Sequence, residues 1–99
     1  MDKNFNIISE NAIVGKDVTI GNFVIIEDGV IIEDGVTIES SVIISSNSKI
    51  GKNSFVGTYS KIGEKTVIGS DCRMNNFKWL FNFFSLVGGN YKMGTLIAV

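Results

Sequence analysis

The stretch IGKNSFVGTYSKIGEKTVIG, which runs from Ile50 to Gly69, repeats one short pattern four times. An aliphatic residue followed by glycine recurs every six residues, and the glycines are Gly51, Gly57, Gly63 and Gly69. A small residue lies two positions before each aliphatic one: Ser48, Ser54, Ser60 and Thr66. A period of six fits neither a helix nor a simple strand alternation, so it indicates a repeat architecture.

The aliphatic position of this repeat is filled twelve times in succession, from Ile8 to Met74. The position two before it is small or β-branched at every step from Ala12 to Cys72. In a strand, residues two apart face the same side. Each six-residue unit therefore predicts a short strand with two inward side chains, followed by a turn.

Turn-forming residues come three positions after each aliphatic residue. Gly, Asn and Asp dominate there, because they tolerate a positive φ. The aromatic exceptions are Phe5, Phe23, Tyr59 and Phe77, which lie in one 18-residue column with Ser41 between them. Residues 18 apart therefore stack, and three strands make one coil. We expect a triangular prism over residues 3–76, with about four coils and a height of about 19 Å.

The pattern aliphatic-Gly-x-x-small-x resembles the hexapeptide repeat of the left-handed parallel β-helix family, over about three quarters of the chain. The resemblance implies an all-β fold whose left-handed coil departs from the usual right-handed crossover. Most family members are acyltransferases, so the resemblance also implies a sugar or nucleotide-sugar O- or N-acetyltransferase lineage. Acetyl-CoA or another acyl-CoA would be a co-substrate of an active enzyme, and no further cofactor is expected.

Histidine is absent from the chain. In the family that the repeat resembles, the general base of acyl transfer is typically a histidine. The carbonic anhydrases of this fold hold zinc with three histidines, so no metal site is expected here. The sequence assigns no catalytic or cofactor-binding residue, and two interpretations stay open. One is a transferase, truncated or using another base, and the other is a non-catalytic scaffold or oligomerisation module.

Residues of reactive types have simpler interpretations within the repeat. Cys72 takes a small inward position, so we expect a buried thiol rather than a nucleophile. Asp71 and Glu64 fall at turns, where solvated carboxylates are expected. Packing and turning explain the repeated serines and glycines, and no strand-to-helix context follows the glycines as in a phosphate loop. We expect a solvated acidic surface from Glu27, Glu33 and Glu39.

Isoleucines occupy outward positions on two neighbouring sides of the predicted prism. They are Ile7, Ile25 and Ile43 on one side, and Ile13 and Ile31 on the next. An exposed apolar patch of this kind usually marks an interface, although strand propensity alone also favours isoleucine. We expect a homo-oligomer, which the family resemblance makes a trimer.

The net charge and the cysteine count limit the classes of binding partner and the cellular compartment that we expect. Nine basic and ten acidic residues give a net charge of −1, so we expect neither nucleic-acid nor membrane binding. A single cysteine excludes an internal disulfide and favours the reducing cytoplasm. No signal peptide and no membrane-spanning segment are expected from the sequence.

The repeat is expected to stop after Met74, because Lys78 takes the next small inward position. Phe77, Leu80, Phe81 and Phe84 have the i, i+3, i+4, i+7 spacing of an amphipathic helix. We expect residues 77–99 to form an aromatic-rich cap or tail, with this helix over the open end of the prism. A truncated or frame-shifted end is the alternative, because no acidic residue follows Asp71.

Overall fold

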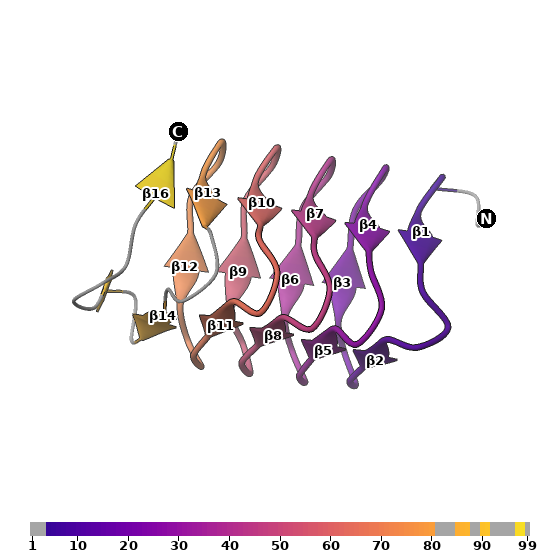
Figure 1. Ribbon diagram of the computed structural model, residues 1–99, viewed down its shortest axis with the longest axis horizontal. Helices are drawn as coiled ribbons and strands as arrows, with labels where there is room; N and C mark the ends of the chain where they lie inside the picture. The colour runs from indigo at the N-terminus through magenta and orange to yellow at the C-terminus, as the bar shows by residue number, and fades with distance from the viewer. Residues whose placement is uncertain (1–3, 81–84, 88–89, 92–96, 99) are drawn as a thin grey trace.

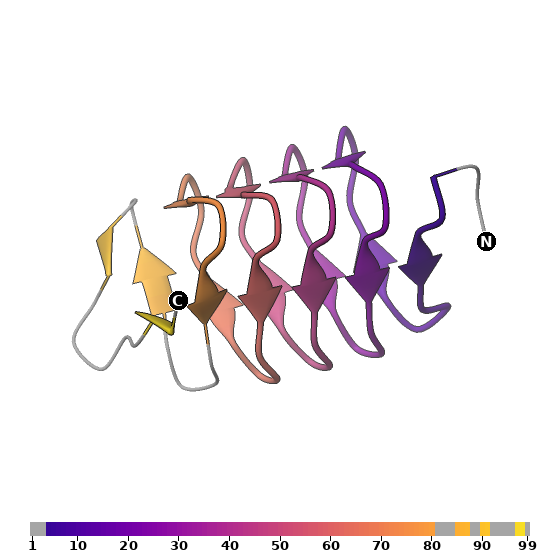
Figure 2. The ribbon, with the colours of Figure 1, turned by 90° about the horizontal axis from the view of Figure 1, so that it is seen from above.

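The computed structural model describes residues 4–80, 85–87, 90–91 and 97–98, and these form only strands and turns. The strands build three sheets, which are the walls of an elongated prism (Figures 1 and 2). At each turn of the repeat the chain leaves one sheet and enters the next, so each strand up to Val67–Ile68 pairs in parallel with the strand three further along. Two later pairs, Trp79–Leu80 with Ile97–Ala98 and Ser85–Val87 with Asn90–Tyr91, are antiparallel. The predicted three-sided coil is confirmed.

Each sheet takes one strand from each of the first four coils, and the later strands join sheets A and B. Sheet A holds β1 (Ile7–Ile8), β4 (Ile25–Ile26), β7 (Ile43–Ile44), β10 (Lys61–Ile62), β13 (Trp79–Leu80) and β16 (Ile97–Ala98). Sheet B holds β2 (Ile13–Val14), β5 (Ile31–Ile32), β8 (Lys49–Ile50), β11 (Val67–Ile68), β14 (Ser85–Val87) and β15 (Asn90–Tyr91). Sheet C holds β3 (Thr19–Ile20), β6 (Thr37–Ile38), β9 (Phe55–Val56) and β12 (Arg73–Met74).

Inward side chains fill the prism as the repeat predicts. The larger inward residues from Ile26 to Leu80 are at most 1% exposed, and the smaller ones, from Val24 to Cys72, at most 2%. The first coil differs, because within the described residues only the second coil packs against it. Ile8 and Val14 are each 38% exposed there, so fully buried inward side chains begin only at the second coil.

The turn positions adopt the left-handed backbone conformation that the sequence predicts. Positive φ angles occur at the non-glycine turn residues from Phe5 to Phe77 and at Gly29 and Gly35. Asn11 is not among them; its N–H instead binds the Ser9 hydroxyl at 3.0 Å. The aromatic column forms two stacked pairs, Phe5 with Phe23 at 5.5 Å and Tyr59 with Phe77 at 5.4 Å between ring centroids.

The predicted helix after Met74 is wrong. Phe77 turns the corner with a φ of 61°, and Trp79–Leu80 form β13, which pairs in parallel with β10. Leu80 is fully buried in the next inward position, and the Lys78 backbone N–H donates to Ser60 Oγ at 3.3 Å, as the N–H of Cys72 does to Ser54 Oγ one unit earlier. Strand pairing 18 residues back therefore overrides the local helical spacing. Phe81 and Phe84 lie outside the described residues.

Candidate functional site

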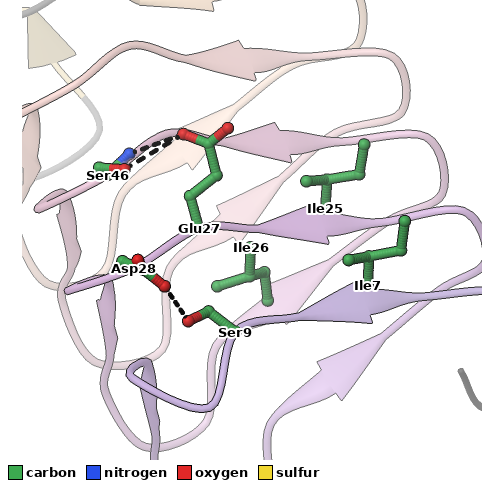
Figure 3. Close-up of a pocket in the computed structure, with 7 residues that line it drawn as sticks. All are labelled: Ile7, Ser9, Ile25, Ile26, Glu27, Asp28 and Ser46. Carbon is green, nitrogen blue, oxygen red and sulfur yellow. Dashed lines mark hydrogen bonds between the residues drawn. The ribbon is translucent and has the colours of Figure 1, made fainter.

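A shallow groove lies on the outer surface of sheet A, where β1 and β4 run into their turns. It has a volume of about 440 Å³ and is lined by Ile7, Ser9, Ile25, Ile26, Glu27, Asp28 and Ser46. Figure 3 shows Ile7 and Ile25 side by side on neighbouring strands, with Glu27 and Asp28 beyond them at the end of β4. The groove thus joins an apolar floor to two carboxylates.

The carboxylates of this groove also hold neighbouring coils together. Glu27 Oε1 accepts hydrogen bonds from the backbone N–H of Ser46 at 3.0 Å and from its hydroxyl at 3.3 Å. The Ser9 hydroxyl, in the turn of the preceding coil, donates to Asp28 Oδ1. Both carboxylates therefore link successive turns, and both side chains remain exposed.

The other two glutamates expected to form an acidic surface also bind the next coil. Glu39 accepts a hydrogen bond from the Thr58 hydroxyl at 3.2 Å, and Glu33 lies 3.7 Å from the Lys49 ammonium. The three glutamates face different walls of the prism, as the 18-residue stacking implies. The sequence analysis did not predict these contacts. Each glutamate has a polar residue 16 or 19 positions further along, and that spacing could have predicted its partner in the next coil.

The residues of reactive types lie apart from one another. The Cys72 side chain is 2% exposed, and its Sγ lies 3.4 Å from the carbonyl oxygen of Ser70. Asp71 and Glu64 lie at exposed turns on two different corners. This arrangement matches a core thiol and two turn residues.

The inward serines form a hydrogen-bond ladder inside the prism. Ser54 Oγ donates to the carbonyl of Gly69 at 2.7 Å and accepts the N–H of Cys72 at 3.1 Å. Ser48 and Ser60 repeat this geometry one unit before and one unit after. Both hydrogen-bonding directions of these hydroxyls are used by the backbone, so they serve the fold.

Asn6 plays the same part in the first coil and was missed in the sequence. It lies two positions before Ile8, where its side chain is 5% exposed. The amide donates to the carbonyl of Gly21 at 2.8 Å and accepts the N–H of Val24 at 2.8 Å. Its position two residues before Ile8, which is the small inward position of the repeat, was the feature of the sequence that could have predicted this role.

The outward isoleucines lie where the sequence places them. Ile7 and Ile13 are 54% and 63% exposed, and Ile31 is also exposed, whereas Ile25 and Ile43 are half-buried by their neighbours. Sheet C is different, since its outer face carries threonines and a contact between Arg73 and the Phe55 ring at 4.0 Å. The apolar surface is therefore concentrated on sheets A and B.

Metal and membrane features are lacking in the part of the chain that the structure describes. No group of three or more cysteine, aspartate or glutamate side chains has the geometry to hold a metal ion there. No helix in these ranges is long and apolar enough to cross a membrane.

Comparison with known proteins places the chain among β-helix proteins. Residues 3–98 match the family described as the GMPPB C-terminal domain. No curated protein matches the chain significantly. The family match covers nearly the whole chain, and its description refers to one domain of a larger protein.

Two solved structures have the same architecture. A UDP-N-acetylglucosamine acyltransferase is 28% identical with a TM-score of 0.75, over 81% of this chain and 35% of that one. The acetyltransferase domain of PglB from Neisseria gonorrhoeae FA1090 is 19% identical with a TM-score of 0.62, over 88% of this chain and 53% of that one. The chain thus spans about a third to a half of these structures. The predicted left-handed parallel β-helix is confirmed.

Proposed function

Because the chain belongs to the family of the GMPPB C-terminal domain and to the hexapeptide-repeat β-helix proteins of the acyltransferase-like lineage, we propose that it is an assembly module. In this role it associates with copies of itself through the outer isoleucines and performs no acyl transfer alone. The family resemblance implies a trimer, but the assembly role itself requires only association between copies and not that number of them. A cytoplasmic location belongs to the same proposal, since a single cysteine suits a reducing compartment.

The observation that carries this proposal is the apolar outer surface of sheets A and B. Ile7, Ile25 and Ile43 form one continuous column over neighbouring strands, and Ile13 and Ile31 form a second. Large contiguous apolar patches are rare on monomers and usually mark contact sites. Comparable support for catalysis is lacking, because the chain has no histidine to act as general base and Cys72 is buried in the core.

Self-association is expected in light scattering, with a mass above the 10.8 kDa of one chain. Replacing both Ile25 and Ile43 with lysine should dissociate the assembly into monomers. Each copy would otherwise have to bury two charged side chains in the contact, which costs desolvation energy. A matched control replaces Thr19 and Thr37 with lysine on sheet C, and it should leave the mass unchanged. A monomeric mass for the unmodified chain at every concentration would refute the assembly role.

Acyl transfer is the second candidate, and the similarity to a UDP-N-acetylglucosamine acyltransferase favours it. An active enzyme would bind an acyl-CoA between copies of the chain. Isothermal titration of the assembled protein with acetyl-CoA is expected to give no binding heat if the chain is only a module. A saturable heat that the free pantetheine portion does not reproduce would instead support the transferase.

A further inference from the structure

We infer that two copies of this chain pair through sheet A with their prism axes antiparallel, related by a two-fold axis that runs along β7. The inference rests on the proposed assembly role and names the partner, the surface and the relative direction. Three features of the described residues carry it: the distribution of charge along the prism, the order of side chains on sheet A, and the acidic groove.

Charge is segregated along the prism although the whole chain is nearly neutral. Residues 4–48 carry seven acidic side chains and one basic one, whereas residues 49–80 carry six basic and two acidic ones. The coils follow each other in sequence order along the prism (Figure 1). One half of the prism is therefore negative and the other positive. Antiparallel pairing brings each negative half onto a positive half, and electrostatic complementarity of this kind selects the orientation of a contact.

The outward column of sheet A is self-complementary in that orientation. From β1 to β13 it reads Ile7, Ile25, Ile43, Lys61 and Trp79, in one register of Cα partners. A two-fold axis along β7 places Ile43 against its own copy. Ile7, at one end of the column, then faces Trp79 of the second copy at the other end. Both side chains are about half-exposed in the single chain, at 54% and 45%.

The remaining pair of the column joins Lys61 to the acidic groove. Lys61 of one copy faces Ile25 of the other, and its methylene stem can lie on this apolar floor while its ammonium reaches into solvent or to an acid. Glu27 and Asp28 stand directly beyond Ile25 (Figure 3). The groove thus offers a lysine both the apolar and the charged surface it needs, and the symmetry repeats this contact twice.

A parallel arrangement lacks this match. Two or three prisms that point the same way would place the Glu27 and Asp28 carboxylates of all copies at the same height, and the lysines likewise. The acidic halves of the copies would then lie side by side, and so would the basic halves, and like charges brought together in a contact are destabilising.

The size of the surface sets the expected strength of the pair. From β1 to β13 sheet A is about 19 Å tall, at the usual spacing of about 4.8 Å between paired strands. Such a small face falls short of the roughly 800 Å² per partner of a standard stable interface. We therefore expect a reversible dimer that weakens at high salt, in place of an obligate one.

Cysteine cross-linking in the full chain tests the orientation. Facing sheets lie about 10 Å apart, which is beyond a disulfide, so a short bismaleimide is the suitable linker. A mixture of Ile25→Cys and Lys61→Cys chains should give a cross-linked pair, because these positions face each other across the two-fold axis. Neither variant alone should cross-link. The unsubstituted chain, whose Cys72 is buried, is the control for background reaction.

Charge reversal provides an independent readout by analytical ultracentrifugation. Lys61→Glu should raise the dimer dissociation constant about tenfold or more, because it places a carboxylate against the acidic groove. Lys52→Glu is the matched control. It makes the same change of charge on an exposed residue of the sheet B side, and it should leave the constant within a factor of about two.

The outcomes separate this inference from the assembly role on which it rests. A chain that stays monomeric in ultracentrifugation overturns both. An assembly in which Ile25→Cys cross-links with itself supports the assembly role and overturns the antiparallel pair. Cross-linking confined to the mixture, together with weakening by Lys61→Glu alone, supports the pair.

Discussion

Replacing Gly51 with alanine is expected to lower the free energy of unfolding by about 2 kcal/mol. A Cβ at this position would lie 2.5 Å from the carbonyl carbon of Gly69 and 2.6 Å from the nitrogen of Ser70 in the next coil. Both are backbone atoms and cannot rotate away. The coils cannot separate either without stretching the hydrogen bond of 2.7 Å from Gly51 N–H to the Ile68 carbonyl. Overpacking of this kind costs about 1–3 kcal/mol.

The loss of backbone entropy in the unfolded chain opposes this destabilisation but is smaller. Alanine restricts the unfolded chain and stabilises by about 0.4–1 kcal/mol where the native backbone accepts it. The clash is the larger of the two, so the net change is destabilising. Urea unfolding followed by circular dichroism measures it, with Ser45→Ala at the equivalent repeat position as the control. Ser45 already carries a Cβ, so its variant should change stability by less than about 0.5 kcal/mol. An alanine at position 51 without effect would contradict the close approach of the coils.

Replacing Ile50 with alanine should cost more, about 3–4 kcal/mol. Its side chain is fully buried in the middle of the stack, with inward isoleucines on both sides along sheet B, Ile32 and Ile68. Removing it deletes buried methyl groups and leaves a cavity that two hydrogen-bonded neighbours cannot close. Large-to-small changes at such sites lie in the range of about 2–5 kcal/mol.

Ile8→Ala is the matched control for this variant. Ile8 occupies the same inward repeat position, but in the first coil it is 38% exposed. Its loss should cost only about 1 kcal/mol, because less apolar surface is transferred to water and solvent fills the space. Equal destabilisation by the two variants in urea unfolding would mean that the first coil is covered as fully as the middle ones.

The sequence predicts most of this fold because one period controls several features at once. Ile26, Ile44 and Ile62 recur at the same inward position, and their spacing predicts both the strands and the partners of those strands. The turn residues agree with this period independently. Few folds place long-range partners at a constant sequence distance, and that is why local reasoning reached the tertiary structure here.

The failures come from interactions that the period does not encode. The spacing of Phe77 and Leu80 matches a helix, but pairing with β10 determines the conformation of Trp79–Leu80. Lys78 breaks the inward pattern by residue type, while its backbone is held like that of the other units. The groove of Glu27 and Asp28 depends on which carboxylate reaches which neighbouring turn. Side-chain geometry of this kind cannot be derived from spacing alone.

The constant register of 18 residues between stacked strands also limits how this domain can change in length. Adding or removing one whole coil keeps every later residue on its own wall and lengthens or shortens the prism by about 4.8 Å. Adding a single six-residue unit preserves the core just as well, yet it rotates all later residues onto the neighbouring wall. The column that begins with Ile7 and Ile25 would then continue on a different side. Evolution can therefore vary the height of the prism without altering its outer faces only in steps of three units.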